Sequence, residues 1–225
     1  GCVRAVPAAS AANLGVDFTC GRKRRAHKQP GVRAGRFARG KARISRPGKL
    51  KFAIGSKVAS KVADSGAMRA TEFGAAVNGL SDSEMDDLQR IALAGASPGA
   101  KGRSRTAVMA ILGDCTWEPA TAPILQWMRV AWKERSEDEG QASLDELSSA
   151  WKEAEGDRPN LIAHDGTRRW SQVRGPLGAM ALSLDRIGWY TCDGKNFVDD
   201  LGITRGVLSF TPASWKGFLK ASVQR

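Results

Sequence analysis

The chain has 225 residues, 42% of them hydrophobic, which is enough to bury an ordinary core in one large domain or two small ones. Its four cysteines form no C-x-x-C pair, its two histidines lie at no metal-ligand spacing, and no apolar run approaches the roughly 20 residues of a transmembrane helix. These features argue against a disordered chain, a structural zinc site and a membrane protein, while the formal net charge of +12 favours an anionic partner.

The N-terminal stretch predicts a short strand. Residues 11–18 alternate apolar and polar side chains and are followed by the pair Cys20-Gly21. The chain begins with Gly1 rather than Met, and Arg225 lies within a predicted amphipathic helix. We therefore expect this sequence to be a fragment of a longer protein.

The positive charge is concentrated in residues 18–63, called the basic segment below. It contains 15 Lys and Arg and no Asp or Glu, whereas the other 20 basic residues of the chain are outnumbered by 23 acidic ones. Residues 31–46 predict a helix that Pro47-Gly48 terminates, and residues 50–63 predict a second helix. Cations without internal carboxylates favour a nucleic acid, whose condensed counterions they displace, over a solvated face or an anionic membrane surface.

The basic segment predicts contacts to the nucleic-acid backbone rather than to bases. Its aromatic residues, Phe37 and Phe52, are better explained as core residues of the two helices, and Arg is well suited to hold a phosphate with its planar fork. The residues that we expect to contact phosphates are Arg22, Lys23, Arg24, Arg25, Lys28, Arg33, Arg36, Arg39, Lys41 and Arg43.

The middle of the chain predicts well-delimited helices. Ser81 and Glu84 have the spacing of a capping box, which predicts a helix that begins after Ser81 and buries Leu88, Ile91 and Ala92. Further helices are expected over residues 118–135, with Pro119 in the first turn, and over residues 143–154, with a charged linker between them.

The C-terminal part mixes helices with a predicted hairpin. A Leu-rich helix is expected over residues 170–187, bent or broken at Gly175-Pro176. Residues 189–191 and 196–198 flank a turn signal and predict a hairpin, and residues 206–210 predict a further strand. Thr211-Pro212 is a typical N-cap and N1 pair, which predicts a last helix with Trp215, Phe218 and Leu219 buried.

No motif supplies a catalytic site. Residues 95–102 are rich in Gly but lack the Gly-Lys-Ser/Thr core of a phosphate-binding loop, and His164-Asp165 is best explained as an exposed turn. Phe-Val-Asp-Asp at 197–200 matches an aromatic-x-Asp-Asp metal motif, but a turn rather than a buried strand precedes it. We therefore expect no catalytic and no metal-binding residues in this chain.

The order of landmarks resembles the region downstream of the catalytic palm in reverse transcriptases of non-LTR retrotransposons. Residues 13–18 (Asn-Leu-Gly-Val-Asp-Phe) resemble that family's aromatic-Leu-Gly-Val strand, residues 21–61 its basic thumb-like region, and residues 72–80 its Tyr-Gly-x-x-Val segment. Asn13 and Phe73 replace the usual aromatic and Tyr, which suggests a divergent copy. The resemblance covers roughly residues 10–95.

The resemblance implies a thumb and connection region whose palm lies upstream and is absent from this chain. Together with the predicted elements, it gives a mainly α fold with minor β, in which a helical, bundle-like thumb region follows a short strand and a small β-hairpin and helix lie near the C-terminus. The expected divisions are a strand remnant (1–20), a basic thumb-like segment (21–64), a helical scaffold (65–135) and C-terminal helices with a hairpin (136–225).

The function that follows is a non-catalytic fragment of an RNA-directed DNA polymerase that contacts the template-primer backbone. Its partners would be RNA or DNA and the missing palm, with no membrane, and its location intracellular, with the nucleus as one candidate compartment. No cofactor is expected in this chain, although the parent would use Mg²⁺. The alternatives are a free-standing basic RNA- or DNA-binding module, and an enzyme with an unrecognised site in the tryptophan-rich C-terminal half, around Trp170, Asp185, Trp189 and Asp193.

Overall fold

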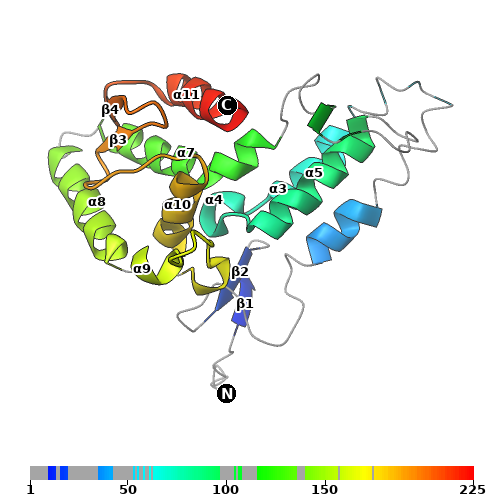
Figure 1. Ribbon diagram of the computed structural model, residues 1–225, viewed down its shortest axis with the longest axis horizontal. Coiled ribbons are helices and arrows are strands. Elements are labelled where there is room, and N and C mark those ends of the chain that lie inside the picture. The colour runs from blue at the N-terminus through cyan, green and yellow to red at the C-terminus, as the bar shows by residue number, and fades with distance from the viewer. Residues whose placement is uncertain are drawn as a thin grey trace, which may run out of the picture.

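The computed structural model is mainly helical with minor β structure, as predicted, and its described strands form two small antiparallel sheets (Figure 1). It describes residues 10–13, 16–19, 35–42, 53, 55, 58, 61, 63–96, 104, 106, 107, 116–135, 140–156, 158–173 and 175–225.

The N-terminal stretch forms two strands and not the single predicted one. Strand β1 (Ser10–Asn13) pairs antiparallel with β2 (Val16–Thr19), and Asn13 lies opposite Val16. Two residues separate the strands, which is the commonest loop length of a hairpin. The alternating pattern runs through both strands and therefore gave no sign of the reversal.

The basic segment is described only in part. Residues 35–42, within the predicted helix 31–46, are helical and are called helix 35–42 below. Of the second predicted helix, the described residues Ala53, Val58 and Lys61 are helical, and the remainder, apart from Gly55 and the first residue of η1, lies outside the described residues.

Three short helices follow, and a longer one then begins at the predicted capping box. These elements are the π-helix η1 (Ala63–Met68), α3 (Arg69–Glu72), α4 (Ala75–Asn78) and α5 (Asp82–Ala96). The Ser81 backbone N–H donates to Glu84 Oε2 at 2.8 Å and the Glu84 N–H donates to Ser81 Oγ at 3.3 Å. Leu88, Ile91 and Ala92 are buried, so this prediction is confirmed.

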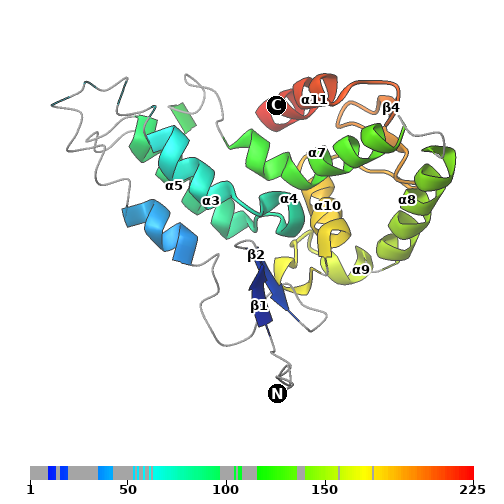
Figure 2. The ribbon, with the colours of Figure 1, turned by 180° about the vertical axis from the view of Figure 1, so that it is seen from behind.

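The central and C-terminal helices surround a second core. They are α7 (Trp117–Glu134), α8 (Gly140–Glu155), α9 (Arg158–Leu161), the 3-10 helix η2 (Trp170–Gln172), α10 (Gly175–Arg186) and α11 (Pro212–Gln224). Helix α7 runs behind α10 and α11 in Figure 1, and Figure 2 shows it from the other side. The predicted helices 118–135 and 143–154 are confirmed.

The predicted helix 170–187 is broken, earlier than its centre. Helix η2 ends before Val173, and α10 begins at Gly175, which places Pro176 in a first turn where its missing N–H costs nothing. The final helix begins as predicted, because Thr211 Oγ1 accepts a hydrogen bond from the Ser214 N–H at 3.2 Å.

The strands near the C-terminus pair differently from the prediction. Strand β3 (Asn196–Val198) pairs with β4 (Thr204–Gly206), and the predicted partner stretch 189–191 contributes only an isolated bridge between Tyr190 and Val198. Strand β4 also ends where the predicted strand 206–210 was expected to begin. An alternating pattern indicates a strand, but it does not show which other strand the connecting turn will bring beside it.

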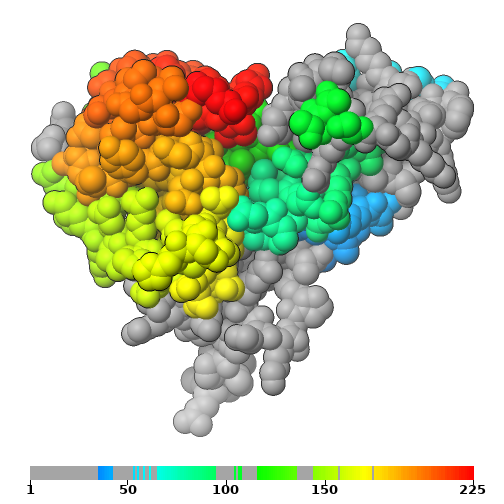
Figure 3. Space-filling model, viewed as in Figure 1, coloured from blue at the N-terminus to red at the C-terminus, as the bar shows by residue number. Residues whose placement is uncertain are grey.

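The described residues form two hydrophobic cores, and the division between the cores falls within α7. The N-terminal core combines helix 35–42 with η1, α4 and α5 and reaches Ala120, whereas the C-terminal core begins at Ile124 and extends to Leu219. The predicted boundary between residues 135 and 136 is therefore not where the cores separate. We call the described residues between 35 and 120 the N-terminal unit and those between 124 and 225 the C-terminal unit. The space-filling view shows these two units side by side (Figure 3).

None of the helices in the described part of the chain combines the length and the apolar character that crossing a membrane requires.

Candidate nucleic-acid interface

Helix 35–42 is fixed to the N-terminal unit by its apolar face. Phe37 is 7% exposed and belongs to the N-terminal core together with Met68 and Leu88. Gly40 lies so close to α3 that a Cβ at this position would be 2.5 Å from Thr71 Oγ1. The helix therefore packs through small and apolar residues, which leaves its charged residues toward the surface.

The three described cations of this helix have different surroundings. The Arg36 guanidinium donates to the Phe73 carbonyl at 2.8 Å and lies over the Phe73 ring, 4.6 Å from its centre. Lys41 Nζ pairs with Asp87 on α5 at 2.8 Å, although the Lys41 side chain remains 52% exposed. Arg39 is exposed, and its Nε donates to the Gly35 carbonyl of its own helix at 3.2 Å.

The structure thus places three of the ten predicted phosphate-binding residues on one short helix. Arg36 and Arg39 are three positions apart and so lie on the same flank. No local pattern indicates that Phe73 and Asp87 are the partners, because both lie in other elements. The other seven predicted residues lie outside the described ones: Arg22, Lys23, Arg24, Arg25, Lys28, Arg33 and Arg43.

A group of charged residues that no sequence pattern indicated joins the two units. Arg186, on α10, donates to Asp82 Oδ1 at 2.8 Å and to the Leu80 carbonyl at 2.5 Å, and it lies over the ring of Trp170. Arg168 donates to the same Asp82 carboxylate. Asp82 is the first residue of α5, where a carboxylate also stabilises the helix N-terminus.

Burial governs the electrostatics of this junction. It lowers the pKa of the Arg186 guanidinium, and the hydrogen bond from Arg186 to Asp82 opposes the shift. Arg186 Nη1 is buried and has no hydrogen-bond partner among the described residues. The neighbouring cleft, about 650 Å³ between α5, α10 and α11, contains the three cations Arg168, Arg186 and Arg225 and the three carboxylates Asp82, Asp86 and Asp200. These opposite charges balance, so the cleft does not favour a polyanion.

The Asp199-Asp200 pair is held by arginines and not arranged for a metal. Burial alone would raise the pKa of Asp199, but N–H groups of Ile203 and Leu201 and the Arg205 guanidinium lower it. Hydrogen bonds from Arg225 hold the pKa of Asp200 well below its usual range.

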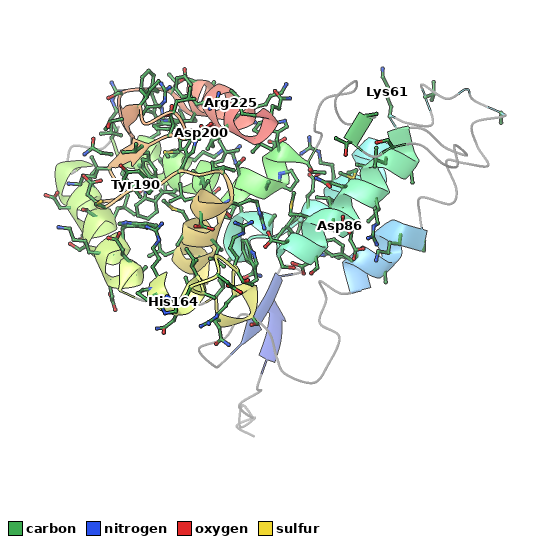
Figure 4. All side chains as sticks on the ribbon, in the orientation of Figure 1. Lys61, Asp86, His164, Tyr190, Asp200 and Arg225 are labelled. Atoms are coloured by element: carbon green, nitrogen blue, oxygen red, sulfur yellow. The ribbon has the colours of Figure 1, made fainter. Side chains whose placement is uncertain are left out.

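The two carboxylates therefore have separate structural partners. Asp200 and Arg225 lie beside each other in Figure 4, at the end of the last helix. The described residues include no group of three His, Cys, Asp or Glu that could hold a metal ion.

The tryptophans of the C-terminal half serve the core and not a pocket. Trp127 Nε1 donates to the Gly194 carbonyl at 2.8 Å and Trp151 Nε1 to the Thr191 carbonyl at 3.2 Å, and both side chains are buried. The His164-Asp165 pair is exposed in a turn, as expected. Of the residues named for the enzyme alternative, Trp170 and Trp189 are also buried, Trp189 Nε1 donates to Ser222 Oγ at 2.9 Å, and Asp185 pairs with Arg168.

Comparison of the chain with protein-family models, with curated proteins and with solved structures found no match in any of the three.

Proposed function

We propose that this chain binds nucleic acid through its basic segment, mainly by contacts to backbone phosphates. The observation that carries the proposal is the segregation of charge: 15 cations and no carboxylate in residues 18–63, in a chain whose remainder is slightly acidic. Such a segment releases counterions when it meets regularly spaced phosphates, and this release is the main source of sequence-independent affinity.

The surroundings of helix 35–42 support this role. Phe37 and Gly40 dock the helix through its apolar face, with added contacts from Arg36 to Phe73 and from Lys41 to Asp87, and Arg39 stays exposed. The ion pair between Lys41 and Asp87 is a surface pair, of a kind that contributes about 0.2–1 kcal/mol. A phosphate could replace Asp87 as the partner of Lys41 at small cost.

We propose in addition that the parent protein is a reverse transcriptase of a non-LTR retrotransposon and that this chain belongs to its thumb and connection region. The support is the ordered set of landmarks over residues 10–95. In this proposal polymerisation and the Mg²⁺ that it needs belong to the upstream palm, and no step of that reaction uses residues of this chain.

The test is binding across a salt series to an RNA–DNA hybrid, a DNA duplex and a single strand. We expect steeply salt-dependent binding, with a slope of about 0.9 per phosphate contact on duplex DNA. Changing residues 22–25 (Arg-Lys-Arg-Arg) to Glu should abolish tight binding at moderate salt and reduce the slope by about one for each phosphate that the variant no longer neutralises.

In the matched control, four exposed cations of the C-terminal unit are changed to Glu: Arg129, Lys152, Arg169 and Lys220. This variant changes net charge by the same amount, and we expect it to keep most of the affinity. Equal losses in both variants would show that only net charge matters and would contradict a binding role of the basic segment. A preference for the hybrid would favour the reverse transcriptase over the free-standing module.

A further inference from the structure

Phe73 presents an aromatic ring to solvent at the corner between α3 and α4. Phe73 is 54% exposed, and among the described aromatic residues only Tyr190 is comparably exposed. Gly74 follows with φ of 84°, a left-handed conformation that glycine adopts without steric cost, and this turn separates the two short helices. The ring is thus displayed by a defined turn and is not part of the N-terminal core.

Arg36 holds this corner from helix 35–42. One of its N–H groups donates to the Phe73 carbonyl at 2.8 Å, which fixes the backbone, and its guanidinium lies 4.6 Å from the ring centre. A planar guanidinium over an aromatic ring is a favourable cation–π arrangement. The two side chains together form a cation–π pair that joins the basic segment to an exposed ring.

We infer that Phe73 and Arg36 form a stacking platform for an unpaired nucleobase of a strand whose phosphates contact the basic segment. This inference rests on the proposed function and adds a ligand class to it. Aromatic rings and guanidinium planes are the surfaces on which proteins stack splayed-out bases, and every base has a face that can stack. Bases inside a duplex are stacked on each other, so the platform selects single-stranded or unpaired positions.

The charge around the platform fits this ligand. Arg39 lies one helical turn beyond Arg36, roughly 4.5 Å along the helix axis, and is exposed. A strand that stacks one base on Phe73 would therefore have an adjacent phosphate near a second guanidinium. Glu72 lies next to Phe73 in the sequence, but it pairs with Arg69.

The experiment compares two single strands of equal length, one with bases and one abasic throughout, so that their phosphates match. Binding of the full chain is measured with Phe73→Leu, with Phe73→Trp and with Tyr190→Leu, which removes the comparably exposed aromatic ring of the C-terminal unit. Phe73→Leu keeps the carbonyl that Arg36 binds and removes a largely exposed ring, so the fold should persist, as far-UV circular dichroism would verify.

We expect Phe73→Leu to weaken binding of the base-containing strand by about 5- to 150-fold and to leave binding of the abasic strand unchanged. Phe73→Trp should bind the base-containing strand at least as tightly as the unchanged protein, and Tyr190→Leu should have no effect.

Equal losses for both strands, or no loss for either, would overturn the platform. Failure of the unchanged protein to bind either strand at low salt would overturn the proposed function together with the platform. Retained, salt-dependent binding that Phe73→Leu does not alter would remove the platform alone.

Discussion

The two cores of this molecule are built from different residues. Five of the seven tryptophans are buried in the C-terminal core, and they are Trp127, Trp151, Trp170, Trp189 and Trp215. The N-terminal core contains no tryptophan among the described residues and relies on Phe37 with alanine, leucine, isoleucine and methionine. An indole ring buries more apolar area than an alanine, leucine, isoleucine or methionine side chain. The C-terminal core therefore buries more apolar area per residue, on average, than the N-terminal core.

The difference extends to polar contacts. The indole N–H groups of Trp127 and Trp151 donate to carbonyls of a loop that is distant in sequence, and that of Trp215 donates to the Val207 carbonyl in the segment before its own helix. These bonds attach irregular segments to the core. The N-terminal unit instead closes its helix with a capping box and keeps a cationic helix at its edge. One unit is suited to be a scaffold and the other to present charge.

The largest effect expected from this contrast is that of Trp215→Ala. Trp215 is fully buried, contacts the rings of Trp189, Phe197, Phe210 and Phe218, and donates to the Val207 carbonyl. Its loss should lower the free energy of unfolding by about 3–5 kcal/mol. Urea unfolding followed by tryptophan fluorescence measures this, because all seven tryptophans lie at or beyond residue 117 and report on the C-terminal part.

Leu88→Ala is the matched change in the N-terminal core, since Leu88 is fully buried there. If the units unfold separately, this change should shift the transition seen by far-UV circular dichroism and leave the fluorescence transition in place. Coincident shifts by both probes would show instead that the two cores unfold as one cooperative unit.

An intermediate effect is expected for Arg186→Met, which addresses the contact between the units. The change removes hydrogen bonds to Asp82 and to the Leu80 carbonyl and should cost about 2 kcal/mol, because hydrogen bonds to charged groups at a part-buried site are among the stronger ones. Arg168→Met removes a more exposed partner of the same carboxylate, together with the ion pair between Arg168 and Asp185, and should cost about 1 kcal/mol or less. Equal costs, measured by urea unfolding, would contradict the role of burial.

The smallest effect is expected in the pH dependence of the C-terminal unit. The pKa of Asp200 is lower in the folded chain than the usual value of about 3.9, so the stabilisation that Asp200 contributes is present above that value and is lost as the pH falls below it. Asp200→Asn should therefore flatten the decline in unfolding free energy below about pH 4. Water screens the partly exposed Arg225, so the difference should stay below about 1 kcal/mol. A steeper decline of the unfolding free energy in the variant would contradict a lowered pKa of Asp200 in the folded chain.

Local signals predicted the helix boundaries well. The capping box at Ser81 and Glu84 and the pair Thr211-Pro212 each act within one helical turn, so the residues that form the contact are the ones that the sequence places together. Strand pairing was predicted less well. The stretch 189–191 was expected to form a hairpin with β3, yet β3 pairs mainly with β4, because Asp199 organises the turn between them through the N–H groups of Leu201 and Ile203.

The sequence by itself determined the mainly helical fold class, the ends of the capped helices and the concentration of cations in residues 18–63, because each depends on composition or on neighbours in the chain. Only the tertiary structure decided that Arg36 lies over Phe73, that Lys41 pairs with Asp87 and that Arg186 joins α10 to the start of α5. These partners are distant in sequence, and packing of the helices is what brings them together. A charge pattern shows how many cations a segment has, whereas the packed fold decides which of them already have a partner.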